Sequence, residues 1–180
     1  PIYSNIIYPF PKNPPHIPHT DNPVGSYLRK FYLPDSWKGR RVFLHFKAGT
    51  SGMYVWVNGQ KVGYSQVSKS PVEFDISPYV RAGKNLLAVE VYRWTDGSYL
   101  EDQDFWRLSG IDRDVYLYST DHTRIFDFFV RPELDKNYLN GNLTVDIYVR
   151  NYHNKEQIQQ VSISLFDPSR KIIFTKQKEI

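Results

Sequence analysis

The chain has 180 residues, of which 41% are hydrophobic, and it contains no cysteine. This length fits one or two domains, and the hydrophobic content is sufficient for a packed core, which excludes a disordered tail. Without cysteine the chain forms no disulfide framework, zinc finger or thiol redox site. The missing cysteines do not distinguish a cytoplasmic from a periplasmic protein.

The formal net charge is +4, which raises the question of a nucleic-acid partner. Basic and acidic residues interleave, and the longest basic runs are pairs such as Arg29-Lys30 and Arg40-Arg41. Because binding along phosphates needs clustered cations, we expect no nucleic-acid partner. No apolar run approaches the ~20 residues of a membrane span, so we expect a soluble protein. The chain opens without an initiator Met or a signal peptide, and we expect that it was cut from a longer one.

The first 25 residues hold seven of the 12 prolines, which predicts an extended segment outside any sheet. Tyr3, Tyr8 and Phe10 are too apolar for a loose linker, so we expect an ordered segment that wraps around the first domain. Aromatic residues make up 16% of the chain, and such residues suit half-buried strands, which favours an all-β fold.

Alternating apolar and polar residues predict strands through the first domain, at 27–33, 41–47, 72–76, 86–93 and 115–118. A hairpin is predicted over 54–64, because Asn58-Gly59 between two strand-like runs is typical of a type I′ turn. Ser77 to Gly83 resembles a single helical turn, with Ser77 as its cap and Pro78 in the first helical position.

A polar stretch at 119–123 predicts a domain boundary, which divides the chain into residues 1–120 and 121–180. Further strands are predicted beyond this boundary, at 124–131, 143–150, 161–166 and 171–175. Their spacing suggests an immunoglobulin-like β-sandwich, which needs about seven strands. We therefore expect only the beginning of such a domain in residues 121–180.

Residues 94–111 form a long polar loop between two predicted strands, with four acids and two tryptophans. Long loops of this kind are usually functional or disordered, and the aromatic content argues against disorder. Tryptophan faces beside carboxylates are typical of a sugar site. The alternative is structural: the acids cap turns, while Trp94 and Trp106 cover the core.

Other chemistry has weaker support in the sequence. Glu101 or Asp102 with Asp104 has the composition of a glycosidase carboxylate pair, but spacing within a loop does not establish the distance that such a pair needs. His16 and His19 lie in the proline-rich segment without a third ligand, so we expect no metal site there. The sequence contains no nucleophile elbow, phosphate-binding loop or dinucleotide fingerprint.

A series of motifs in fixed order gives the chain a family resemblance. In chain order they are Asn22-Pro-Val-Gly-Ser-Tyr27, Trp56-Val-Asn-Gly59, Val62-Gly-Tyr-Ser65, Glu73-Phe-Asp75, Arg81-Ala-Gly-Lys-Asn85, the whole of 93–111, and Arg113-Asp-Val115. Over residues 1–120 the sequence resembles the N-terminal sugar-binding domain of glycoside hydrolase family 2, specifically of the β-galactosidases. The rest resembles the start of the Ig-like domain that follows it.

The resemblance implies a jelly-roll, galactose-binding-like β-sandwich, then Ig-like domains, then a TIM barrel that hydrolyses terminal β-D-galactosides with retention. The two catalytic glutamates of the family lie on that barrel, beyond residue 180, so we expect no catalytic residue in this chain and no activity from it alone. The domain of the family begins several strands before Pro1, so we expect an exposed sheet edge. The expected partners are a β-galactoside and the remaining domains of the same polypeptide, with a homo-oligomer plausible for the full-length enzyme.

The resemblance also implies site residues. Asn22 matches an asparagine that helps to bind the sugar, and Asp104, rather than Asp102, matches an aspartate that contacts galactose and helps to hold a sodium ion. Trp94, Tyr99 and Trp106 are weaker candidates as aromatic walls, together with Glu101 and Asp102. Sodium and magnesium are plausible in the full-length enzyme, and no cofactor is expected in this chain.

Three alternatives stay open from the sequence. A stand-alone carbohydrate-binding module would use the same aromatic residues, and a structural sandwich domain of a surface protein would need no site. A β-glucuronidase-type member of the same family would share the architecture.

Overall fold

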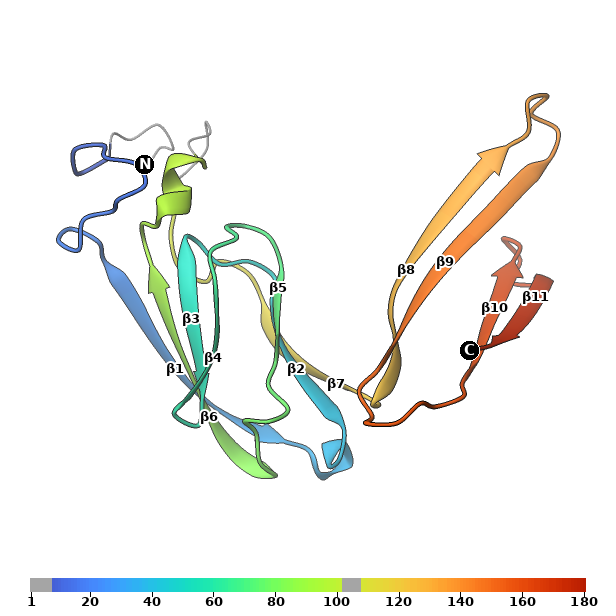
Figure 1. Cartoon of the computed structure of the whole chain (residues 1–180), viewed down its shortest axis with the longest axis horizontal. Coiled ribbons are helices and arrows are strands. Elements are labelled where there is room, and N and C mark those ends of the chain that lie inside the picture. Colours follow the sequence, from blue (N-terminus) through green and yellow to red (C-terminus); the bar gives the residue numbers. More distant parts are fainter. Residues whose placement is uncertain (1–7, 102–107) are drawn as a thin grey trace. The chain divides into compact units, whose positions relative to one another are not determined.

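The computed structural model describes residues 8–101 and 108–180, and the chain divides into two compact units, Pro1–Thr120 and Asp121–Ile180. Figure 1 shows the first unit as two layers of strands. One sheet has the order β1-β6-β3-β4, and the other has the order β5-β2-β7. The strands are β1 (Val24–Leu33), β2 (Arg41–Phe46), β3 (Gly52–Val57), β4 (Gln60–Ser65), β5 (Val72–Asp75), β6 (Gly83–Tyr92) and β7 (Val115–Thr120).

The core of the first unit lies between these two sheets. Alternate residues of β2 and β3 face inward, and Phe46, Val55 and Val57 are fully buried there. Val89 and Val91 of β6 complete the layer from the centre of the larger sheet. The alternation of apolar and polar residues that predicted the strands therefore also determines which side chains form the core, because successive side chains of a strand point to opposite faces. The predicted all-β sandwich is confirmed.

The turn between β3 and β4 is the predicted hairpin turn. Asn58 and Gly59 have φ of 52° and 82°, the positive values that a type I′ turn requires. The Asn58 side chain also donates to Oδ1 of Asn85 at 2.8 Å and accepts from the Leu86 amide at 3.0 Å. Asn85 is buried, and its amide nitrogen donates to the carbonyl of Arg81 at 2.8 Å. These bonds fix the hairpin end to the start of β6.

The predicted helical turn after Ser77 is wrong. Residues 77–79 form a hydrogen-bonded turn, in which the Tyr79 amide donates to the Ile76 carbonyl at 2.9 Å. The Ser77 hydroxyl accepts from the Val42 amide at 2.8 Å instead of capping a helix. Oδ1 of Asp75 accepts from the Ser77 amide at 3.0 Å, a local side-chain turn that competes with helical geometry.

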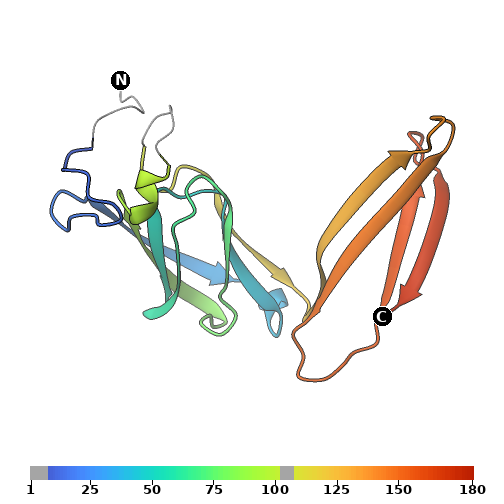
Figure 2. The same ribbon diagram turned by 45° about the horizontal axis from the view of Figure 1, so that its top comes forward.

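The second unit consists of two antiparallel hairpins (Figure 2). Their strands are β8 (Thr123–Leu134) with β9 (Gly141–Asn151), and β10 (Gln160–Phe166) with β11 (Ile172–Glu179). Val145 and Ile147 of β9 and Ile163 of β10 line a common cavity of about 240 Å³. Every strand residue of this unit is exposed or half-buried, so the apolar face of each hairpin is incompletely covered.

Candidate functional site

The candidate site lies where β6 ends and the predicted loop begins. A 3-10 turn, η2 (Asp96–Tyr99), follows β6, and the described part of the N-terminal segment runs beside it (Figure 1). The Arg93 amide donates to the Pro23 carbonyl at 3.0 Å, which extends the β1–β6 pairing beyond the last strand residues. Backbone pairing between β1 and β6 therefore fixes the position of the residue at which the loop begins.

The Asn22 side chain binds both backbone groups of Trp94. Its Nδ2 donates to the Trp94 carbonyl at 3.0 Å, and its Oδ1 accepts from the Trp94 amide at 2.9 Å. One amide group thus replaces the backbone of a partner strand, since it offers the same donor and acceptor as a peptide group. The amide retains one N–H and one acceptor lone pair for another partner.

Four aromatic rings form a cluster beside Asn22. Tyr8 is at the centre, with ring centroids 5.3 Å from Trp94, 5.4 Å from Tyr99 and 5.7 Å from Phe10. Trp94 is only 5% exposed, and Phe10 meets it edge-on at 5.8 Å. Tyr99 donates its hydroxyl hydrogen to the His16 carbonyl at 2.9 Å. The proline-rich segment is therefore held to the loop by burial as well as by hydrogen bonds.

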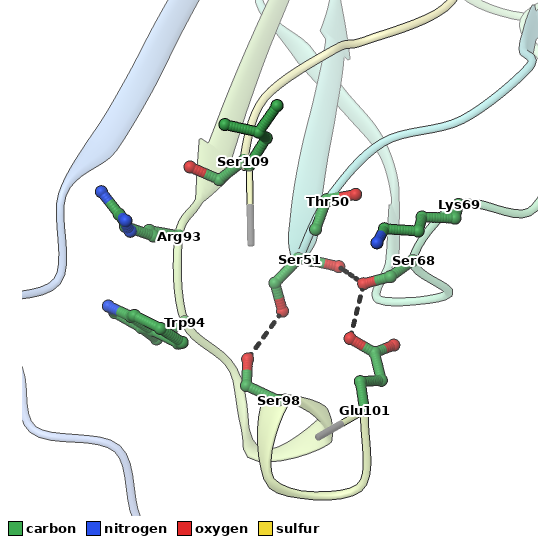
Figure 3. A pocket seen from close by; sticks show the side chains of 10 residues that line it. Thr50, Ser51, Ser68, Lys69, Arg93, Trp94, Ser98, Glu101 and Ser109 are labelled. Atoms are coloured by element: carbon green, nitrogen blue, oxygen red, sulfur yellow. Dashed lines mark hydrogen bonds between the residues drawn. The ribbon is translucent and has the colours of Figure 1, made fainter. Parts of the chain in front are cut away.

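A row of serine and threonine hydroxyls joins the loop to β3. Ser51 Oγ lies 2.5 Å from Thr95 Oγ1. It also lies 3.1 Å from Ser98 Oγ, a contact drawn in Figure 3. The Ser98 hydroxyl also accepts from the Thr95 amide at 3.0 Å, while its carbonyl accepts from the Tyr8 hydroxyl at 2.7 Å. These bonds hold η2 against both neighbouring segments.

A pocket of about 220 Å³ opens beside this row of hydroxyls (Figure 3). Its described lining comprises Thr50, Ser51, Ser68, Lys69, Arg93, Trp94, Ser98, Glu101, Leu108 and Ser109. Oε2 of Glu101 accepts from the Ser68 hydroxyl at 2.7 Å, so one carboxylate oxygen is already engaged. The pocket combines a carboxylate, a guanidinium, an ammonium and several hydroxyls, a set that can both donate and accept hydrogen bonds.

An aromatic group adjoins the site on the outer face of the larger sheet. The ring of Tyr54 lies 4.5 Å from that of Tyr64, and the Tyr64 hydroxyl donates to Oε1 of Gln66 at 2.6 Å. Burial, with Tyr54 and Asp96 nearby, raises the pKa of the Tyr64 hydroxyl above its ordinary value. Tyr64 therefore stays neutral at physiological pH.

The structure brings some of the predicted site residues together. Asn22, Trp94 and Tyr99 belong to one contact region, and Glu101 lines the pocket next to Trp94. Asp102, Asp104 and Trp106 lie outside the described residues. The sugar contacts expected of all these residues stay predictions.

The sodium site expected at Asp104 likewise stays a prediction. Among residues 8–101 and 108–180 no group of three His, Asp or Glu side chains is placed to hold a metal ion. No helix in the described ranges has the length and apolar character of a membrane span.

No sequence motif indicated that the hydroxyls of Ser51, Ser68 and Ser98, or the side chain of Arg93, line this pocket. Serines are frequent in the chain, and these three come from segments far apart in the sequence. No local motif distinguishes them. The pairing of β3 with both β4 and β6 brings them to one pocket.

Comparison with known proteins identifies the family. Residues 1–121 match the family model described as glycosyl hydrolases family 2, sugar binding domain. The chain is 49% identical over 172 residues to a protein of Priestia megaterium named beta-galactosidase, and 44% identical over 177 residues to one of Vibrio cholerae. These alignments cover 93% and 98% of the chain, and 17% of each relative. The chain belongs to glycosyl hydrolase family 2, and the family resemblance seen in the sequence is confirmed.

Solved structures show the same fold. A beta-glucuronidase of Bacteroides uniformis matches 87% of the chain with a TM-score of 0.80 at 22% identity, and the match covers 20% of that protein. A beta-glycosidase of Bacteroides vulgatus matches 87% with a TM-score of 0.72 at 28% identity, again over 20% of its length. The likeness to the Bacteroides uniformis protein, at 22% identity, shows the fold alone.

Proposed function

We propose that this chain is the N-terminal part of a retaining β-galactosidase that hydrolyses terminal β-D-galactosides. The observation that carries the proposal is the 49% identity, over 172 residues, to a Priestia megaterium protein named beta-galactosidase. The chain spans 17% of that relative. Catalysis is assigned to glutamates beyond residue 180, and the chain alone is inactive.

The role of this part is to contribute sugar contacts. Asn22 and Asp104 bind hydroxyls of galactose, and Asp104 supplies one oxygen ligand to a sodium ion. The free N–H and lone pair of the Asn22 amide support this role, because its bonds to Trp94 leave capacity for a sugar hydroxyl. The remaining domains of the longer protein are its partners.

The β-glucuronidase alternative has weaker support. The solved beta-glucuronidase of Bacteroides uniformis is 22% identical to the chain, whereas the curated relatives named beta-galactosidase are 41% to 49% identical. At the lower identity the likeness concerns the fold rather than the substrate. The galactosidase proposal is therefore preferred.

A chimera tests the proposal. This chain replaces the matching region of the Priestia megaterium protein, and hydrolysis of a chromogenic β-galactoside is measured beside the isolated chain. We expect an active chimera and an inert chain. Asp104→Ala and Asn22→Ala in the chimera lower kcat/KM by roughly 10- to 100-fold, the effect of losing a hydrogen bond to a sugar hydroxyl.

The matched control is Asp112→Ala, because Asp112 is exposed. We expect this variant to keep the activity of the chimera. An assembled chimera that is equally active with Asn22→Ala, Asp104→Ala and Asp112→Ala contradicts the proposed contacts. Hydrolysis by the chain alone contradicts the assignment of catalysis to another domain.

A further inference from the structure

The dipeptide Asn-Gly occurs twice in the chain, at residues 58–59 and 140–141. An asparagine before glycine is prone to cyclisation, because glycine has no side chain to shield its amide nitrogen from the neighbouring carboxamide. Both pairs lie at hairpin ends, the first between β3 and β4 and the second between β8 and β9. The same chemistry is therefore present in two different surroundings.

The carboxamide of Asn58 is held by three hydrogen bonds. Its Nδ2 donates to the Tyr79 carbonyl at 2.9 Å and to Oδ1 of Asn85 at 2.8 Å, while its Oδ1 accepts from the Leu86 amide at 3.0 Å. Both hydrogens of the amide group are thus engaged. Rotation of this group toward the Gly59 nitrogen breaks these bonds, so cyclisation at Asn58 requires local opening of the hairpin end.

The carboxamide of Asn140 is exposed, in the turn that joins β8 to β9 (Figure 1). Its bond from Nδ2 to Oδ2 of Asp135, at 2.7 Å, is the single side-chain hydrogen bond that it forms with the described residues. The Asp135 amide donates to the Asn140 carbonyl at 2.9 Å. The next pair along the ladder, Leu134 with Gly141, is then of the non-hydrogen-bonded kind, so the Gly141 amide points away from β8.

We propose that Asn140 is a site of spontaneous deamidation by water, and that its hydrogen bonds protect Asn58 from the same reaction. The Gly141 amide nitrogen loses its proton to a base in the solvent and attacks Cγ of Asn140. The bond from Cγ to Nδ2 breaks, and ammonia leaves. Water then opens the cyclic imide at either carbonyl, which gives aspartate or isoaspartate at position 140. Neither step involves a sugar or a catalytic glutamate, so this site is independent of the proposed function.

The reaction adds a carboxylate to a turn that is organised by another one. Oδ1 of Asp135 accepts from the amides of Asn137 at 3.1 Å and Leu139 at 2.9 Å. The Leu139 amide, followed by the Asn140 side chain, holds the pKa of Asp135 below its ordinary value. Deamidation replaces the Asn140 donor with a negative charge that faces Asp135. We therefore expect the converted chain to lose hydrogen-exchange protection at this end of the β8–β9 hairpin.

The test compares the two asparagines within one sample. The 180-residue chain is kept in a mildly alkaline buffer and digested with trypsin, which places Asn58 and Asn140 in the separate peptides 48–61 and 137–150. Fragment masses locate the mass gain of deamidation, and a sample digested without incubation gives the background. We expect conversion at Asn140 to be at least roughly tenfold faster than at Asn58, which reacts only from locally opened molecules. Equal rates, faster reaction at Asn58, or an unconverted Asn140 overturn the proposal.

Concentrated urea is the control for local sequence. The hydrogen bonds of Asn58 are absent from the unfolded chain, so we expect the two asparagines to react at similar rates there. If Asn140 reacts as far ahead of Asn58 in urea as in the folded chain, the neighbouring residues set the difference, and the protective role of the fold is overturned.

Gly141→Ala tests the attacking nitrogen. A Cβ at this position meets no atom within 4 Å, so we expect the variant to fold. Conversion at Asn140 slows by roughly tenfold, because the added methyl group shields the amide nitrogen. The rate at Asn58 in the same variant is the matched control, and it stays unchanged. Undiminished conversion at Asn140 in Gly141→Ala excludes the cyclic route and overturns the proposal.

Discussion

At the scale of single residues, Asn22 determines how the loop leaves the sheet. Asn22→Asp replaces the Nδ2 donor with an oxygen that faces the Trp94 carbonyl. We expect a loss of about 1–3 kcal/mol in the free energy of unfolding, because that part-buried carbonyl loses this donor and meets a negative charge. Urea unfolding followed by tryptophan fluorescence measures the loss, since Trp94 reports on the same place.

The control for this substitution is Asn13→Asp, which makes the same change at an exposed residue. We expect it to unfold like the unsubstituted chain. If both aspartate variants are equally stable, the two bonds to Trp94 do not hold the loop, and Asn22 is then free to serve the sugar alone.

At the scale of elements, turns that depend on adjacent residues could be predicted from the sequence, whereas the pairing of distant strands could not. The turn at Asn58-Gly59 was predictable because its positive φ values depend on two adjacent residues. The pairing of β1 with β6 was not, because it joins Val24 to Tyr92 across most of the unit. The Asn22 bonds to Trp94 follow from that pairing and were equally inaccessible to sequence reasoning. Family resemblance implied a sugar-binding role for Asn22, which stays a prediction, and did not indicate its contact with Trp94.

The packing of β4 against β5 gives a prediction for one glycine. A Cβ on Gly63 would lie 2.7 Å from Cε1 of Phe74, whose ring is buried and packs edge-on against Phe46 at 6.2 Å. Because the Phe74 ring is buried against Phe46, we expect Gly63→Ala to cost about 1–3 kcal/mol in the free energy of unfolding. Thermal unfolding measures this loss.

Gly97→Ala is the matched control for Gly63→Ala. A Cβ there meets Thr95 Oγ1 at 3.5 Å and Gln66 Nε2 at 3.9 Å, which are ordinary contacts. We expect a much smaller change in melting temperature. Equal melting temperatures for the two alanine variants would show that the Phe74 ring relaxes and that this contact does not limit the packing.

At the scale of the whole molecule, the two units differ in how completely they bury apolar residues. The first unit has a core of fully buried side chains, including Phe46, Val55 and Ile76. In the second unit no strand residue is buried, and Phe128 and Ile173 are 63% and 62% exposed. Because hairpins without a covered apolar face are marginally stable in water, the second unit depends on further contacts for its stability.

Hydrogen exchange of the 180-residue chain measures the difference in local stability between the two units. Among the described strands β3 pairs on both sides, whereas β9 pairs only with β8, so the comparison is limited to amides that donate within their own ladder, where a difference in protection reports burial. We expect β9 amides to exchange at least roughly 100-fold faster than β3 amides, a difference of ~2.7 kcal/mol in opening free energy. Equal protection would mean that the exposed apolar faces of the second unit are covered in solution. Such covering would make the second unit, rather than the loop after β6, the place to look for an additional partner.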